Sequence, residues 1–155
     1  MRDVVVEHGM TIPYGIRLSA GQIVMVEFGP DPRLIAPPGV MTGPLGVQPE
    51  MFKERHGIVL STTNGLITIV RLSTKAPPIV KAFHYRISAG AYGGMSTTED
   101  SWTKSDLLTT VSSARVDRPF VGGRRAEVHL SAADLKAVRA TVLHALQLGR
   151  LVPNL

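Results

Sequence analysis

The sequence contains no cysteine among its 155 residues. Disulfide bonds and thiolate metal sites are therefore excluded, and the chain fits a reducing compartment. It also has no apolar run long enough to cross a membrane as a helix. Residues 1–7 lack the basic start and apolar stretch of a signal peptide, so we expect a cytoplasmic protein that does not contact the membrane.

The spacing that would indicate a metal site is also missing. Metal-binding histidines, like the thiolates already excluded, recur at short fixed intervals in a chain. The histidines to which we assign no role are scattered instead, so we expect neither a bound metal nor a cofactor. They are His8, His84, His129 and His144.

What the sequence does contain is a basic middle. The net charge is +5, and residues 53–125 hold 11 lysines and arginines against 5 acidic residues. The local basic excess is therefore at least as large as that of the whole chain. Such a stretch suits an anionic partner such as a nucleic acid, held mainly through its phosphates. A solvated basic surface explains the same count, and charge alone does not decide between the two.

The pattern of apolar residues predicts short strands followed by one helix. Hydrophobic residues make up 44% of the chain, which is typical of a globular domain. Asn64-Gly65 lies between two apolar runs and is a strong hairpin signal. We expect a proline-rich loop at 29–49, an irregular N-terminal extension at 1–20 and one barrel domain over 21–150. The strands are predicted at residues 23–28, 57–61, 66–72, 82–87 and 102–111.

The helix is predicted to begin after Ser131. Ser131 and Asp134 have the spacing of a capping box, with Leu130 placed for a hydrophobic staple. An apolar face follows at helical spacing, and Gly149 is expected to cap the end. The predicted face consists of Leu135, Val138, Val142 and Leu146. Short strands, hairpins and a closing helix together predict a mainly β fold with α, a small β-barrel.

Four stretches, in order, resemble the MazF/PemK toxins. Residues 21–28 (GQIVMVEF) are similar to the family's opening strand, and residues 49–61 (PEMFKERHGIVLS) to the arginine-bearing start of its second strand. Residues 70–74 (VRLST) are similar to the end of its third strand. Residues 102–106 (WTKSD), followed by 110–116 (TVSSARV), are similar to the strand with a basic-x-Asp pair. Each motif alone is weak, but four in order with matching spacing are specific.

The resemblance implies an SH3-like (CcdB/MazF-like) β-barrel with a C-terminal helix, usually a homodimer. It implies the toxin of a type II toxin-antitoxin system, an mRNA interferase that cleaves single-stranded RNA at short sequences. Such toxins are neutralised by a cognate antitoxin whose tail lies along the RNA groove. The implied chemistry is metal-independent: the RNA's 2′-hydroxyl attacks the adjacent phosphorus and leaves a 2′,3′-cyclic phosphate.

That chemistry needs a base, a cation for the phosphorane and stabilisation of the leaving oxygen. By position, Arg55 matches the family's arginine, Ser73 its hydroxyl, and Lys104 and Asp106 its basic-x-Asp pair. We therefore expect Arg55 to bind the phosphate and Asp106 to act as the base. Ordinary surface roles compete for each of them. Further candidates for substrate binding are Thr74, Lys53, His56, Arg71 and Lys75.

Three departures from the family pattern leave other functions open. His56 and Gly57 follow the arginine where the family has proline and valine, and Arg71 replaces a proline. One alternative is a binding toxin of the same barrel, like CcdB, which poisons DNA gyrase and cleaves nothing. Another is a catalytically inactive MazF-like protein that binds nucleic acid.

Overall fold

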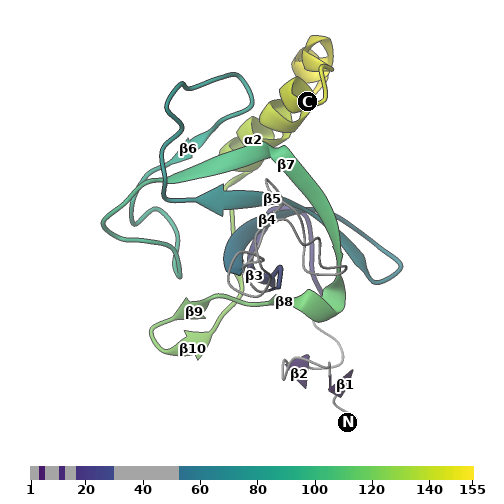
Figure 1. The fold of residues 1–155 in the computed structure, drawn as a ribbon, viewed down its shortest axis with the longest axis vertical. Coiled ribbons are helices and arrows are strands. Elements are labelled where there is room, and N and C mark those ends of the chain that lie inside the picture. Colours follow the sequence, from purple (N-terminus) through teal and green to yellow (C-terminus); the bar gives the residue numbers. More distant parts are fainter. Residues whose placement is uncertain (1–3, 6–10, 13–16, 30–52) are drawn as a thin grey trace, which may run out of the picture.

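The computed structural model describes residues 17–29 and 53–155, together with the backbone of residues 4–5 and 11–12. Its main feature is a curled antiparallel sheet with the strand order β11-β3-β4-β5-β7-β6, in which β8 also pairs with β3 (Figure 1). Two separate strand pairs, β1-β2 and β9-β10, flank it. The elements are β1 (Val4–Val5), β2 (Thr11–Ile12), β3 (Gln22–Glu27), β4 (Glu54–Thr63), β5 (Leu66–Ser73), β6 (Arg86–Ile87), β7 (Ser101–Ser112), η2 (Ser113–Arg115), β8 (Val116–Asp117), β9 (Phe120–Val121), β10 (Arg124–Arg125), β11 (Val128–His129), α2 (Ala132–Ala145) and η3 (Gly149–Asn154).

The predicted hairpin is confirmed. Strands β4 and β5 pair antiparallel, and Asn64 and Gly65 join them with φ of 51° and 77°. Positive φ at both central residues is what a type I′ turn requires, and asparagine and glycine adopt it most readily. No strand was predicted within residues 1–20, yet β1 and β2 pair there. The predicted loop at 29–49 lies, apart from Gly29, outside the described residues.

The sheet separates two apolar clusters because side chains alternate along each strand. We call one side the inner face; it carries the fully buried Val24, Val26, Val59 and Ile69. The other side, the helix face, packs against α2. It is covered by Val138 and Val142 of the helix, and its strand residues include Ile23, Ile58, Val70 and Leu72. Residues two apart on a strand therefore share one of these faces.

Helix α2 begins as predicted but its capping box is only half formed. The backbone N–H of Asp134 donates to Ser131 Oγ at 3.1 Å. The Asp134 carboxylate instead accepts hydrogen bonds from the hydroxyls of Tyr85, at 2.6 Å, and Tyr92. The carboxylate thus binds two tyrosine hydroxyls and not the Ser131 N–H, which donates to the Tyr92 hydroxyl oxygen.

The end of α2 corrects two predictions. The left-handed residue after the helix is Gln147, with φ of 61°, and not Gly149. The N–H of Leu148 donates to the carbonyl of Leu143, which is the bond of a Schellman motif. Leu146 is 52% exposed and lies beyond the helix, so it does not belong to the buried face.

The strand predicted over residues 82–87 is mostly a turn. Only Arg86 and Ile87 pair as β6. Ahead of them, the His84 N–H donates to the Lys81 carbonyl at 2.9 Å, and this bond closes a tight turn that an extended strand excludes. Among the described helices, none combines the length and apolarity that crossing a bilayer requires.

Candidate active site

The inner face changes from apolar to basic toward the end of β5. Register places Gly57 of β4 opposite Arg71 of β5, and Arg71 opposite Lys104 of β7. Arg55 lies two residues before Gly57 on β4 and so shares its face. The same alternation places Ser73 with Arg71. Residues from three neighbouring strands thus meet at one end of the inner face.

Asp106 joins this group through an irregularity in β7. Ile69 pairs with Thr109 and Arg71 with Lys104, so the single residue Val70 lies opposite four residues of β7. Ser105 is buried on the helix face, where its hydroxyl lies 2.7 Å from that of Thr141. Lys104 and Asp106 flank Ser105 and therefore project to the other side, with Asp106 exposed.

The charges of this group act on one another. Burial lowers the pKa of Arg71, and the neighbouring Arg55 lowers it further. Burial also lowers the pKa of Lys104; Asp106 opposes that shift, whereas Arg71 and Lys75 add to it. The three cations are partly buried and repel one another, and a bound anion would relieve that repulsion.

The two arginines have unused donors. Arg55 Nε and Arg71 Nε are buried and have no hydrogen-bond partner among the described residues. Neither guanidinium makes an ion pair within residues 17–29 and 53–155. The two side chains are partly buried, and a phosphate is a ligand that fits a guanidinium group.

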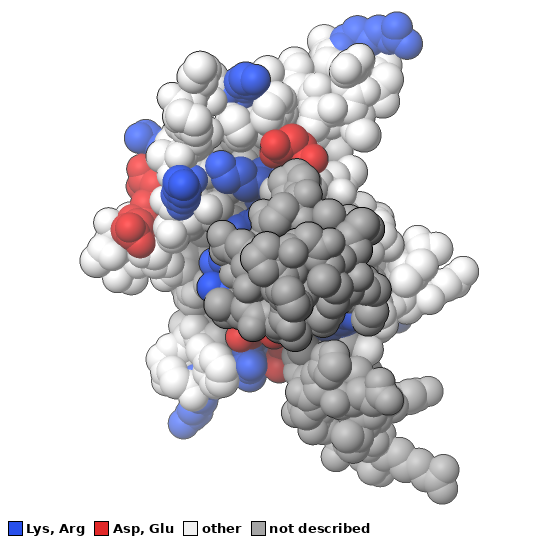
Figure 2. Space-filling view, in the orientation of Figure 1, with Lys and Arg blue, Asp and Glu red and all other residues white. Residues whose placement is uncertain are grey.

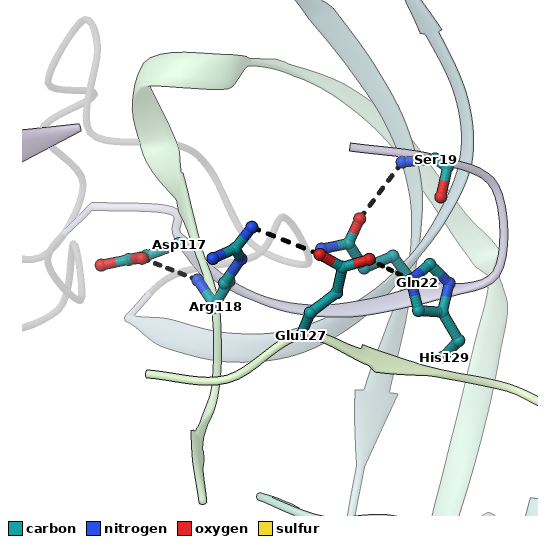
Figure 3. Close-up of polar contacts among 6 residues, drawn as sticks. All are labelled: Ser19, Gln22, Asp117, Arg118, Glu127 and His129. Carbon is teal, nitrogen blue, oxygen red and sulfur yellow. Dashed lines mark hydrogen bonds and ion pairs between the residues drawn. The ribbon is translucent and has the colours of Figure 1, made fainter. Parts of the chain in front are cut away.

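A second cluster of charged residues is ion-paired. Beside β3, β8 and β11, Glu127 accepts from Arg118 Nη2 at 3.3 Å and lies 2.6 Å from His129 Nε2 (Figure 3). In the same cluster Gln22 Oε1 accepts from the Ser19 N–H, while the Arg118 N–H donates to Asp117. Arg118 Nε and Gln22 Nε2 of this cluster are also buried without a hydrogen-bond partner. The Arg118 guanidinium, however, is ion-paired with Glu127, whereas those of Arg55 and Arg71 have no ion pair among the described residues.

The space-filling view agrees with this distribution. Figure 2 shows basic side chains gathered over the part of the surface where Figure 1 draws β5, β6 and β7, with acidic side chains among them. Throughout the described ranges, no group of three or more histidine, aspartate or glutamate side chains is placed to hold a metal ion.

The remaining predicted residues are distributed differently. Ser73 Oγ accepts from the Lys75 N–H at 3.2 Å, which leaves the hydroxyl proton free to donate. Thr74 and Lys75 are exposed just after it, and Lys53 is exposed beside the start of β4. His56 is separated from the group: it lies on the helix face, and its Nε2 is 2.7 Å from the carbonyl oxygen of Gly94.

One residue near the site was missed from the sequence. His84, to which sequence analysis assigned no role, lies where the charges of Lys104 and Asp106 act on its imidazole. No local signal could have indicated this, because the contact depends on how the turn before β6 lies against β7.

The fold resembles that of a solved endoribonuclease in complex with its cognate antitoxin from mycobacterial species. The TM-score is 0.54 at 12% sequence identity, and the match covers 85% of this chain and 97% of that one. The expected small SH3-like barrel with a C-terminal helix is thereby confirmed. The Mycobacterium tuberculosis toxin MazF-mt6 is 16% identical with a TM-score of 0.49, covering 64% of this chain and 92% of that one.

None of the curated proteins compared with the chain matches it. A family model does match, over residues 19–146: that of the PemK-like, MazF-like toxins of type II toxin-antitoxin systems. This range includes all four sequence stretches that resemble the family and all the site residues described above. The chain therefore belongs to the PemK-like, MazF-like toxin family of type II toxin-antitoxin systems.

Proposed function

We propose that this toxin is a metal-independent endoribonuclease that cleaves single-stranded RNA and leaves a 2′,3′-cyclic phosphate. The observation that carries the proposal is the pair of arginines, Arg55 and Arg71, which share the inner face and have no ion pair among the described residues. The family, and the similarity to a structure described as an endoribonuclease, support the same conclusion.

The residues of the inner face divide the reaction among them. The Asp106 carboxylate takes the proton of the 2′-hydroxyl as its oxygen bonds to phosphorus. The guanidinium groups of Arg55 and Arg71 hold the non-bridging oxygens and stabilise the charge of the phosphorane. The Ser73 hydroxyl adds one further hydrogen bond to the phosphate.

The bond from phosphorus to the 5′-oxygen then breaks. Lys104 gives that oxygen a proton, and its lowered pKa, caused first by burial, suits a lysine that must release one. Water restores the proton to Lys104 and removes the one held by Asp106. Thr74, Lys75 and Lys53 lie beside this site and contact the flanking phosphates.

The proposal includes partners. A cognate antitoxin with an acidic segment would occupy the basic end of the inner face and exclude RNA, as suits a family of toxin-antitoxin systems. We also propose a homodimer, with messenger RNA in the cytoplasm as the substrate.

The test is incubation of the pure protein with a long RNA in EDTA. We expect cuts at a short sequence, with cyclic phosphate ends identified by mass spectrometry. Arg55→Ala is expected to lower kcat by about 10²- to 10³-fold, as loss of a transition-state donor does. Asp106→Asn is expected to lower it by about 10²- to 10⁴-fold. Arg139→Ala, an exposed arginine of α2, is the matched control and should cleave normally.

Two other outcomes would replace the proposal. Intact RNA together with blocked DNA supercoiling by gyrase would identify a gyrase-binding toxin. Tight RNA binding without cleavage would identify an inactive nucleic-acid-binding member of the family.

A further inference from the structure

The turn before β6 is held against β7 at Lys104. The Tyr85 N–H donates to Thr103 Oγ1 at 2.8 Å, and the Thr103 N–H donates to the Tyr85 carbonyl at 2.9 Å. The next pair along is Arg86 with Trp102. Extending this antiparallel register by one residue places His84 opposite Lys104.

Alternation then decides which way the imidazole projects. Tyr85 lies on the helix face, because its hydroxyl bonds to Asp134 of α2. Its neighbour His84 therefore projects to the inner face, beside Lys104, which itself lies opposite Arg71. The charged groups that act on His84 agree with this placement: Lys104 and Asp106 from β7, and Lys81 from its own turn.

A backbone hydrogen bond settles which ring nitrogen carries the proton. The Lys81 N–H donates to His84 Nδ1 at 3.1 Å. A backbone N–H can only donate, so Nδ1 is the acceptor and the proton of the neutral ring is on Nε2. Nε2 has no hydrogen-bond partner among the residues that the structure describes.

The same bond argues against proton transfer by this histidine. Protonation would place an N–H on Nδ1 directly against the Lys81 N–H. Consistent with this, the pKa of His84 is lowered by burial first and then by the positive charges of Lys104 and Lys81, with Asp106 opposing them. The lowered pKa and the bond to Nδ1 both favour the neutral ring, whose one lone pair is then occupied.

We propose that His84 is a further RNA-binding residue of this site, which uses its Nε2–H as a neutral donor to an oxygen of the phosphate that Arg71 holds. It acts as neither the base nor the acid of the reaction. The proposal rests on the proposed function for its substrate. What it adds is a hydrogen-bond donor from the turn before β6, which lies outside the strands that carry the family's motifs.

The test compares His84→Ala with His84→Gln, because the glutamine amide nitrogen can donate where Nε2–H did. We measure kcat/KM on a cleavable RNA, and the Kd of the same RNA with a 2′-deoxy substitution at the cut. His84→Ala should lose about 10- to 100-fold in both, the range for a hydrogen bond to a charged group. His84→Gln should recover most of the loss, and both should keep the wild-type pH profile. His129→Ala is the matched control and should change neither constant.

Each other result overturns the proposal or separates it from the proposed function. If the wild type cleaves RNA and His84→Ala equals it, His84 has no role. If glutamine fails as alanine does and a limb of the pH profile disappears, His84 transfers a proton and the donor role is wrong. If the wild type neither cleaves nor binds RNA, both proposals fail.

A measurement on the free protein tests the tautomer independently of RNA. In a ¹⁵N-labelled sample at neutral pH, the long-range proton–nitrogen spectrum of His84 should show an unprotonated Nδ1 and a protonated Nε2. A protonated Nδ1 would overturn the proposal.

Discussion

At the scale of single residues, Asp134 links the helix to the segment that holds His84. Its carboxylate accepts from Tyr85, which is bonded to Thr103, and from Tyr92, whose hydroxyl oxygen also accepts from the Ser131 N–H. Residues 85–92 are thereby attached to the start of α2. The sequence indicated only the local partner, Ser131, because a capping box is a short-range pattern.

Removing one of these hydroxyls should weaken the fold. Tyr85→Phe leaves the ring in place but removes a donor to the carboxylate, so we expect a loss of about 1 to 2 kcal/mol in the free energy of unfolding. Urea denaturation measures it. An unchanged urea midpoint would show that water replaces the hydroxyl without cost.

The hydrogen bond between Tyr85 and Asp134 also predicts how stability depends on pH. The hydrogen bond to Asp134 raises the pKa of Tyr85 from 10.0 to about 12, so the fold stabilises the neutral phenol. Its contribution is complete below about pH 10 and is lost as the pH rises toward about 12. The difference in stability between the wild type and Tyr85→Phe should therefore shrink over that interval. A difference that stayed constant would contradict the assignment.

Asp134 makes stability depend on pH in the opposite direction, at low pH. Hydrogen bonds from Tyr85, and then from Tyr92 and Ser131, lower the pKa of Asp134 below 3.8. This contribution is present above about pH 4 and is lost as the pH falls below that value toward the lowered pKa. Asp134→Asn should therefore be less stable than the wild type at pH 7 and closer to it at pH 2, by the same denaturation assay.

At the scale of elements, β7 serves both faces of the sheet. Its residues Ser101, Thr103 and Ser105 are buried, whereas Lys104 and Asp106 project from the inner face. The irregularity opposite Val70 is where Asp106 lies. The sequence predicted a strand over 102–111 and the shared face of Lys104 and Asp106, but no pattern indicated the extra residues opposite β5.

The attachment of α2 to β7 gives a prediction at this scale. Thr141 Oγ1 donates its only proton to the Val138 carbonyl at 2.6 Å, so the buried Ser105 hydroxyl is the donor to Thr141. Thr141→Val should cost about 1 to 3 kcal/mol because it leaves that donor buried without a partner. The double variant Ser105→Ala, Thr141→Val should recover part of the loss. Thermal and urea denaturation of the four proteins measure the coupling, and simple additivity would contradict it.

At the scale of the whole molecule, the basic residues Arg55, Arg71 and Lys104 lie together at one end of the inner face. The proposed RNA binding should therefore weaken with salt through counterion release. Arg71→Ala should make the slope of log K against log salt less negative by about 0.7, the value for one phosphate contact on a single strand. Fluorescence titration of the 2′-deoxy-substituted RNA measures it. Arg139→Ala should keep the wild-type slope.

The longer strands, the helix and the family were determined by the sequence itself. Strand alternation, the Asn64-Gly65 turn and the Ser131 cap are local patterns, and local geometry is enough to produce them. The strand predicted over 82–87 was wrong because a hydrogen bond between Lys81 and His84 closes a turn there.

Only the tertiary structure decided which side chains share a surface. Adjacent residues of a strand face opposite ways, so Arg55 joins Arg71 while His56, one position along, bonds to Gly94 on the helix face. Register across β4, β5 and β7 aligns residues almost fifty positions apart, and a shift of one residue would reverse every face. Because the sequence does not reveal the register, it indicated Arg55 and Asp106 as separate candidates and left His84 unassigned.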